Sequence, residues 1–232
     1  MTNFNKNIKF LREQNQMTHQ QLSMMCNITV ESLKTFETTS TEPTLTELVF
    51  LAEALNFPVD RLILDNLEYN NSILKNFEFK FLALDIDGVL TDAGMYCTEN
   101  GDEFKKFNAK DGLAIKTLTA TGKHVGFISS GKNNKIIESR AELLGVQKVY
   151  TGTWKKAEIL EEWCKELNIG FENIAYIGDD VNDLPAIRKV GLSACPSDAA
   201  NLVKETVNII LSKKGGEGCV REFIDKYIME IK

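Results

Sequence analysis

The sequence predicts an α/β fold for residues 77–232, with a Rossmann-like parallel sheet and helices on both faces, preceded by a small all-α domain. Three near-continuous apolar runs, FKFLALDID, HVGFISSG and NIAYIGDD, each end in acidic or small residues, which is typical of buried parallel strands. Two stretches with helical periodicity, Asn134 to Leu144 and Lys156 to Leu167, lie between the second and third runs. This alternation of strand and helix places helices on both sides of a parallel sheet.

The composition is that of a soluble globular protein with a modest negative charge. The 232 residues carry a net charge of -6, which argues against a general polyanion-binding surface, because such surfaces need clustered Lys and Arg. The five cysteines are scattered without a C-x-x-C pair, so we expect reduced thiols rather than a zinc or redox site. The sequence shows neither a leader pattern nor an apolar run of about 18 residues. We therefore expect a cytoplasmic protein without membrane association.

Residues 1–65 are predicted to form short helices, because apolar residues recur there at spacings of three and four. Thr18 and Gln21 form a capping-box pattern at the start of one helix. Two predicted helices, Thr18 to Cys26 and Thr29 to Phe36, are joined by a short turn and have the proportions of a helix-turn-helix. With its flanking helices, the segment resembles the DNA-binding domains of the Cro and phage-repressor family.

Charge within this first domain does not favour binding to DNA. Residues 1–70 contain five basic and nine acidic residues, a net charge of -4. The predicted recognition helix has Lys34 as its cation, between Glu31 and Glu37. Its polar residues suit a solvated face as well as they suit contacts with bases or phosphates. We expect dimerisation or partner docking, and we treat sequence-specific DNA binding as the less favoured alternative.

An Asn-rich segment, 66–76, breaks the helical periodicity and is predicted to be a linker. The expected organisation is therefore a helix-turn-helix domain over 1–65, a linker over 66–76 and an α/β domain over 77–232.

The first strand of the α/β domain ends in DIDG, which places two carboxylates just beyond the sheet. Side chains two apart on an extended strand point the same way, so Asp85 and Asp87 are expected to converge. Gly88 allows the chain to turn sharply after them. Ligands of open α/β sheets bind at this edge, beyond the carboxyl ends of the strands.

A second acidic cluster, GDDVND, follows another apolar strand and contributes Asp179, Asp180 and Asp183. Carboxylates gathered at two neighbouring strand ends repel one another unless a cation neutralises them. Magnesium prefers oxygen ligands and commonly takes few of them from the protein. The two motifs together predict a magnesium site.

Two further positions complete the expected site. Ser130 and Gly131 end the strand HVGFIS, where a hydroxyl and a backbone N–H can hold phosphate oxygens. The run ISSGK leaves Ser129 as the alternative for the hydroxyl role. Lys156 in TWKKAEIL precedes a helix and is placed to neutralise the same phosphate.

Taken in order, the Asp, Ser, Lys and GDD motifs resemble those of the haloacid dehalogenase superfamily phosphatases across residues 77–232. The resemblance implies in-line attack by Asp85 on a phosphomonoester, with Asp87 as general acid and then general base. It implies Mg²⁺ held by Asp85, the backbone carbonyl of Asp87 and Asp179. Ser130 and Lys156 would stabilise the phosphoryl oxygens. Asp180 and Asp183 would orient metal-bound water.

Four segments narrow the resemblance: DIDGVLTD, ENGDEFKKFNAKDGLAI, AYIGDDVNDLP and KKGGEGCVREF. They are similar to those of 3-deoxy-D-manno-octulosonate 8-phosphate phosphatases, which serve lipopolysaccharide biosynthesis, and of relatives acting on nonulosonate 9-phosphates. Such enzymes are capless, magnesium-dependent and typically tetrameric, so the resemblance implies a small-molecule sugar phosphate substrate and a homotetramer. The segment between Asp85 and Ser130 has room for one hairpin around Glu99 to Gly101 and one helix, not for a lid domain.

Two lysines qualify the resemblance. The octulosonate phosphatases carry Arg after the Thr-Gly of the second motif, whereas Lys132 follows Ser130-Gly131 here. Arg and Lys differ in bidentate reach, so this departure leaves the sugar undecided. Lys110 matches a position that the family uses near the substrate, and it equally suits a solvated lysine before a helix.

The glycine-rich segment Lys213 to Glu222 is predicted to reach over the active site of a neighbouring subunit. Its glycines give the chain flexibility, and Arg221 offers a fork for a carboxylate or phosphate. The alternative is a mobile loop before a last helix, Val220 to Ile231.

Two functions follow from the whole sequence: a sugar-phosphate phosphatase, or a transcriptional regulator that senses a sugar phosphate. The presence of every catalytic position favours the first.

Overall fold

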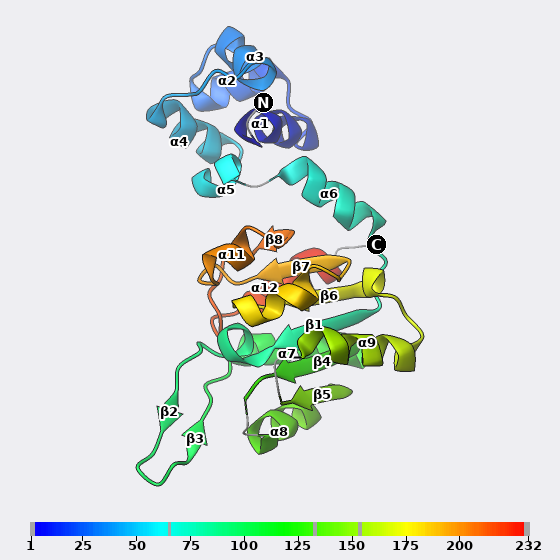
Figure 1. Cartoon of the computed structure of the whole chain (residues 1–232). Coiled ribbons are helices and arrows are strands. Elements are labelled where there is room, and N and C mark those ends of the chain that lie inside the picture. The colour runs from blue at the N-terminus through cyan, green and yellow to red at the C-terminus, as the bar shows by residue number, and fades with distance from the viewer. Residues whose placement is uncertain (1–2, 65, 132–133, 153–154, 230–232) are drawn as a thin grey trace. The chain divides into compact units, whose positions relative to one another are not determined.

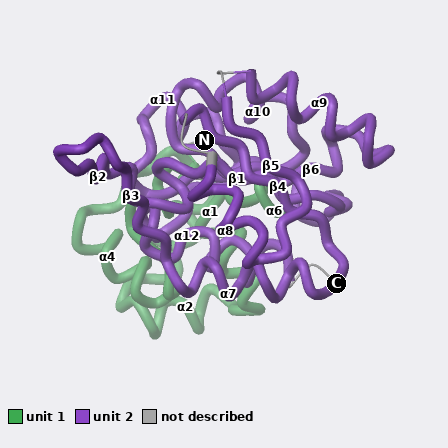
Figure 2. The backbone as a smooth tube through the Cα atoms, turned by 90° about the horizontal axis from the view of Figure 1, so that it is seen from below, with its two compact units in different colours: residues 1–72 green, residues 73–232 purple. Residues whose placement is uncertain are grey.

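A computed structural model of the chain describes residues 3–64, 66–131, 134–152 and 155–229. The chain forms two compact units, residues 1–72 and residues 73–232, coloured separately in Figure 2. No helix among the described residues is long and apolar enough to cross a membrane.

Helices are the only regular elements among the described residues of the N-terminal unit, as predicted. Its helices are α1 (Asn3–Gln14), α2 (His19–Cys26), α3 (Val30–Thr38), α4 (Leu45–Ala54) and α5 (Val59–Leu64). Thr18 and Thr44 each form a complete capping box, and Thr29 accepts the Ser32 N–H at the start of α3. Asn27 ends α2 in the left-handed region, with φ of 53°, and so makes the turn between the two helices of the helix-turn-helix.

A buried ion pair fastens α3 to α1. The Arg12 guanidinium donates to both carboxylate oxygens of Glu37, at 2.7 and 2.8 Å. Burial raises the pKa of Glu37, but the hydrogen bonds and the charge of Arg12 lower it by more. The pKa of Glu37 is therefore below its ordinary value. The negative charge of Glu37 is therefore compensated by Arg12 inside the unit. The exposed face of the recognition helix carries Glu31 and Lys34.

The segment predicted as a linker is mostly helical. Residues Leu67–Asn76 form α6, and the boundary between the two units falls inside this helix, between Ser72 and Ile73. Leu67 packs into the core of the N-terminal unit, whereas Ile73 and Leu74 pack against the core of the second. Burial of apolar residues near both ends therefore stabilises this helix. Its Asn-rich middle is the reason that the sequence pattern did not predict it.

The second unit is built on a six-stranded sheet of order β5-β4-β1-β6-β7-β8, in which every neighbouring pair is parallel. The strands are β1 (Phe81–Asp85), β4 (His124–Ser129), β5 (Lys148–Thr151), β6 (Ile174–Ile177), β7 (Leu192–Cys195) and β8 (Ile209–Ile210). The chain builds outward from β1 to β4 and β5, then returns to the other side of β1 for β6, β7 and β8. The strand order therefore reverses at β1, where such folds open a crevice for ligands.

Helices cover both faces of the sheet, which confirms the predicted fold class (Figure 1). They are α7 (Ala109–Ala120), α8 (Asn134–Leu144), α9 (Lys156–Leu167), α10 (Leu184–Ile187), α11 (Asn201–Lys204) and α12 (Cys219–Phe223), the last continued by η4 (Ile224–Ile228). One core packs α7, α8 and α12 against alternate strand residues such as Leu82 and Leu84. The other packs α9, α10 and α11 against the intervening residues, such as Phe81 and Ala83. Because β1 is buried on both faces, it reads as a continuous apolar run.

The excursion between β1 and β4 is short, as the sequence predicted for a capless enzyme. It consists of the turn η1 (Ile86–Leu90), a hairpin of β2 (Tyr96–Cys97) and β3 (Glu103–Phe104), and α7. The hairpin projects away from the sheet (Figure 1). No lid domain covers the carboxyl end of the sheet within the described residues of this excursion.

Candidate active site

Asp85 is the last residue of β1, and its side chain is almost fully buried at the carboxyl end of the sheet. The Asp85 carboxylate accepts the N–H of Ile86 at 2.8 Å, which starts the turn η1. Gly88 completes this turn with φ of +88°, and a Cβ there would lie 2.0 Å from Asp179 Oδ2. The glycine is therefore required both by its backbone angle and by the close approach of a second carboxylate.

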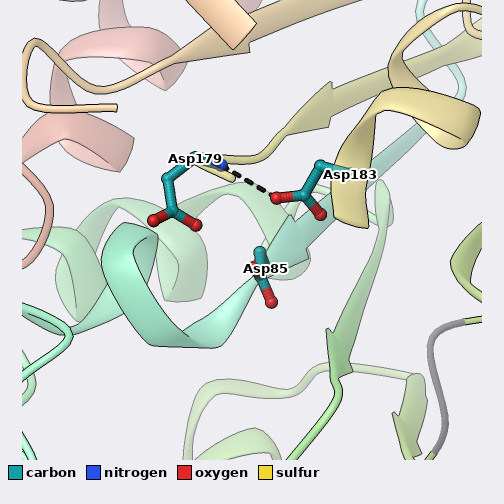
Figure 3. A group of neighbouring side chains, drawn as sticks. All are labelled: Asp85, Asp179 and Asp183. Atoms are coloured by element: carbon teal, nitrogen blue, oxygen red, sulfur yellow. Dashed lines mark hydrogen bonds between the residues drawn. The ribbon is translucent and has the colours of Figure 1, made fainter. Parts of the chain in front are cut away.

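Three carboxylates meet at this point, as Figure 3 shows. Asp85 comes from β1, whereas Asp179 and Asp183 come from the segment after β6. One oxygen from each lies within 4.8 Å of the others. The two acidic motifs, almost a hundred residues apart in the chain, therefore form one cluster.

Asp183 organises this cluster through its hydrogen bonds and is fully buried. Its Oδ2 accepts the N–H groups of Asp179 at 2.9 Å and Asp180 at 3.1 Å. Its Oδ1 accepts from Tyr176 Oη and from Lys156 Nζ, each at 2.6 Å. Both oxygens of Asp183 are thus committed to holding the loop after β6 and two side chains.

Lys156 lies at the start of α9 and is almost fully buried, although a lysine before a helix is usually exposed. Its ammonium lies 2.8 Å from Asp85 Oδ2 and 2.6 Å from Asp183 Oδ1. Burial lowers the pKa of Lys156, but the charges of Asp85 and Asp183 raise it more, so the lysine stays protonated. It therefore supplies a fixed positive charge beside the predicted nucleophile.

One lysine does not balance three carboxylates. Burial and the charge of Asp183 raise the pKa of Asp85 well above its ordinary value, against the opposing effect of Lys156. The same two causes raise the pKa of Asp179 to about 7. Both shifts show that the protein alone does not fully compensate the negative charge at this edge of the sheet.

The donor set fits a hard divalent cation. Asp183 accepts from two N–H groups, a hydroxyl and an ammonium. Asp85 accepts from the Ile86 N–H and Lys156, so the oxygens of Asp85 keep lone pairs that can bind a metal beside Asp179. Oxygen ligands of this kind suit Mg²⁺, which keeps several waters and takes few protein ligands. The residues at the site therefore fit a divalent metal ion.

Asp87 lies at the mouth of the site, where its side chain is 40% exposed. Its Oδ1 accepts from Lys105 Nζ at 2.5 Å, and its Oδ2 lies 3.5 Å from Ser129 Oγ. Lys105 was not among the residues singled out from the sequence, where FKKF offers two adjacent lysines without a distinguishing signal. Only the path of the hairpin decides that Lys105, and not Lys106, reaches Asp87.

Ser129, the last residue of β4, and Ser130, which follows it, have different surroundings. Ser129 accepts the N–H of Gly131 at 3.0 Å through its Oγ and also approaches Asp87. The Ser130 hydroxyl is buried without a hydrogen-bond partner among the described residues. These features favour Ser130 as the phosphate-binding hydroxyl, and Lys132 lies outside the described residues.

Three other predicted residues have no side-chain contact with the acid cluster among the described residues, and Asp180 joins it through its backbone N–H alone. Lys110 is exposed on the first turn of α7, where its N–H is capped by Asn108. Asp180 is exposed and accepts the N–H of Val181. Arg221 lies on α12 and pairs with Asp225 one turn later.

The glycine-rich C-terminal segment packs closely against its own chain, although we expected its glycines to be flexible. It lies against the η1 turn of its own chain, where a Cβ on Gly215 would meet Gly88 O at 2.0 Å. The Gly216 N–H donates to Val89 O at 2.9 Å, and the Cys219 thiol lies 3.3 Å from the same oxygen. The flexibility expected of Gly215 and Gly216 is therefore wrong, because these glycines permit close packing, whereas a contribution of Arg221 to the active site of a neighbouring subunit stays a prediction. The last helix also begins earlier than predicted, at Cys219.

We expect Gly216→Ala to destabilise the protein and disturb the turn that carries Asp87. Gly216 has φ of +66°, and its Cβ would lie 2.6 Å from Asp92 N. Gly122→Ala is the matched control, because Gly122 has φ of +79° and no heavy atom within 4 Å of the position that an added methyl group would take. Backbone strain alone costs of order 1–3 kcal/mol, so the unfolding free energy from urea titration should fall further for Gly216→Ala than for Gly122→Ala. Equal losses would show that the contact with the turn contributes nothing.

Comparison with known proteins agrees with this geometry. A family model described as haloacid dehalogenase-like hydrolase matches residues 130–224, and a helix-turn-helix model matches residues 8–62. The 3-deoxy-D-manno-octulosonate 8-phosphate phosphatase of Escherichia coli is 36% identical over 157 residues, which cover 68% of this chain and 83% of the relative.

Solved structures give the same result. The cobalt-bound deoxy-D-mannose-octulosonate 8-phosphate phosphatase of Haemophilus influenzae is 36% identical, with a TM-score of 0.63, covering 67% of this chain and 90% of that one. The Moraxella catarrhalis 3-deoxy-D-manno-octulosonate 8-phosphate phosphatase, in complex with magnesium, phosphate and the sugar acid, is 32% identical with a TM-score of 0.63, covering 66% and 87%.

An aspartate at the end of the central strand, a buried lysine and an acidic loop after the next strand define a phosphatase of the haloacid dehalogenase class. Within that class, the chain belongs to the family of 3-deoxy-D-manno-octulosonate 8-phosphate phosphatases, with a helix-turn-helix region before the phosphatase domain.

Proposed function

We propose that the chain is a magnesium-dependent phosphatase of a sugar acid phosphate, such as 3-deoxy-D-manno-octulosonate 8-phosphate or a nonulosonate 9-phosphate. The contact of Asp85 with Lys156, beside Asp179, supports this most directly, because it pairs a buried nucleophile with a fixed cation at the ligand-binding edge of the sheet. The named substrates of the relatives support the sugar acid.

In the proposed reaction, an Asp85 oxygen attacks phosphorus and forms a phosphoaspartate as the bond to the leaving oxygen breaks. Asp87 gives its proton to the departing alkoxide and later takes a proton from the water that hydrolyses the phosphoaspartate. Lys156 and the hydroxyl of Ser130 hold the phosphoryl oxygens, and Asp183 keeps Lys156 in place. Asp85, the Asp87 carbonyl and Asp179 would hold Mg²⁺, which supplies positive charge against the negative phosphate.

A phosphate-release assay over a panel of phosphate esters tests the proposal. With Mg²⁺ present, we expect kcat/KM for sugar acid phosphates to exceed that for neutral sugar phosphates by about 100-fold or more, because a site built to pair with a carboxylate rejects substrates that lack one. A preference for neutral sugar phosphates would contradict the proposed substrate class. The absence of phosphate release from every ester would contradict the proposed function itself.

We also infer a homotetramer acting in the cytoplasm. The β2–β3 hairpin carries exposed apolar side chains, with Met95 at 74% and Phe104 at 59% exposure. Exposed apolar side chains gathered on one element are typical of a surface that a partner covers. Light scattering of the full chain should give the mass of four copies, and a monomer at assay concentration would contradict this inference.

The second candidate function is a regulator that senses a sugar phosphate, and the helix-turn-helix match over residues 8–62 is the observation in its favour. We expect weak DNA binding at most, because residues 1–70 carry a net charge of -4 and phosphate contacts dominate affinity for DNA. Selection from random duplexes at physiological salt, followed by gel shift, measures this. A sequence-specific complex in the nanomolar range would favour the regulator.

A further inference from the structure

Lys105 is buried beside the catalytic carboxylate although it belongs to the projecting hairpin. It follows β3 directly, and its side chain is only 5% exposed. Its ammonium contacts Asp87 Oδ1 at 2.5 Å and Glu103 Oε1 at 3.1 Å. Burying a lysine is unfavourable unless carboxylates compensate it, so this position is determined by its two partners.

The contact with Lys105 is the shortest that Asp87 makes with the described residues. The other two are long: Thr91 Oγ1 lies 3.5 Å from Oδ1, and Ser129 Oγ lies 3.5 Å from Oδ2. The Asp87 side chain is also 40% exposed, so packing alone leaves its rotamer free. One charge-assisted contact therefore decides where this carboxylate points.

The neighbouring lysine shows that this contact is selective. Lys106 is 63% exposed and lies 3.1 Å from Asp92 Oδ2, a carboxylate that also accepts from Tyr96. Lys105 and Lys106 thus attach the same arm of the hairpin to two different acids. Lys106 fastens the base of the hairpin, whereas Lys105 reaches the residue that exchanges protons with the substrate.

We propose that Lys105 is the positioning residue for Asp87. It holds Oδ1, so that Oδ2 faces the site and delivers the proton to the leaving oxygen. Lys105 acts through Asp87 and does not contact the reacting atoms. Because it follows β3, it also links the position of the hairpin to the proton-transfer step.

The inference rests on the proposed phosphatase chemistry but not on the identity of the sugar. A leaving group that is a poor base departs without a proton, so it does not need an oriented Asp87. An alkoxide leaving group does need one. Comparison of an aryl and an alkyl phosphate therefore separates positioning of the acid from binding of the phosphate.

The test compares Lys105→Met with the matched control Lys106→Met, using kcat/KM for p-nitrophenyl phosphate and for an alkyl phosphate. This constant covers steps up to departure of the leaving group and excludes later hydrolysis of the phosphoaspartate. General acid catalysis contributes about 10²- to 10⁴-fold, so Lys105→Met should lower the alkyl value by about 10- to 100-fold and the aryl value by less than about threefold. Lys106→Met should change neither by more than about threefold, since it leaves the contact to Asp87 intact.

Two further measurements exclude a merely structural effect. Lys105→Arg keeps the charge and should restore part of the alkyl activity. In an Asp87→Asn background, Lys105→Met should cost less than about twofold on the alkyl phosphate, because residues that act as a unit are not additive.

Equal losses on the aryl and alkyl substrates, or no loss on either, would overturn the proposal. A crystal structure of Lys105→Met provides a readout that needs no activity, and there Asp87 should leave its position or occupy several rotamers. An unmoved Asp87 in that structure would overturn the proposal as well. If the wild type releases phosphate from neither of these esters nor from any sugar acid phosphate of the panel, the proposed function fails, whereas the crystal structure still decides the role of Lys105.

Discussion

Asp85→Asn is expected to lower kcat by at least about 10⁴-fold, because it removes the nucleophile and loss of such a group commonly costs this much or more. The substitution changes little volume at a residue that is 5% exposed. Burial raises the pKa of Asp85, which means that the fold disfavours the charged carboxylate that catalysis requires. The variant should therefore melt at the same temperature as the wild type or higher, while Lys156 keeps its contact with Asp183.

Phosphate release and thermal melting should be measured on protein purified identically for both forms, so that a contaminating phosphatase appears equally in each. Single-turnover measurements should also show no phosphorylated protein for the variant. Turnover above the contaminant level would rule out the phosphoaspartate scheme. A large drop in melting temperature would instead show that Asp85 is needed for folding.

Removal of divalent metal is expected to reduce phosphate release to background, and added Mg²⁺ should restore it. Asp85 and Asp179 lie in one carboxylate cluster that a single lysine does not balance, and a phosphate group would add further negative charge. Without a cation, repulsion opposes both binding of the substrate and attack by Asp85. Activity should be assayed after exhaustive chelation and again after titration with Mg²⁺.

Thermal melting gives a second readout that is independent of turnover. A ligand that binds only the folded state raises its stability according to mass action. Mg²⁺ should therefore raise the melting temperature of the wild type, and Asp179→Asn should remove most of this increase. Activity that survives complete chelation would show that the carboxylate cluster has another purpose.

The fold was predictable wherever local patterns and the final packing agree. Helices α8 and α9 have the bounds that periodicity predicted, and the apolar runs became β1, β4 and β6. Helix α6 was missed because its Asn-rich middle has low helix propensity and its apolar ends pack into two different cores. The helical structure of that segment depends on burial against residues far away in the chain, which a local sequence pattern does not show.

Much of the site was predictable because its carboxylates occupy strand ends, and parallel strands bring such ends together. Asp85, Asp179 and Lys156 meet as the motifs implied. Lys105 was not predictable, because the register and path of the hairpin, rather than composition, select it over Lys106. The flexibility predicted for Gly215 and Gly216 was wrong for a related reason. A glycine occurs both where a chain is flexible and where two backbones pack closely, and the sequence alone does not separate these two cases.

The hydrogen bonds of Asp183 also affect how the active site forms when the chain folds. Its two oxygens join β6 through Tyr176, α9 through Lys156, and the backbone of the loop that carries Asp179. Lys156 also contacts Asp85 at the end of β1, so the reactive centre is complete only when β1, β6 and α9 have assembled. Competence is therefore a cooperative property of the fold, and a population of chains should divide into fully active and silent molecules. In rising urea, activity and the unfolding of the second unit, residues 73–232, should follow one curve.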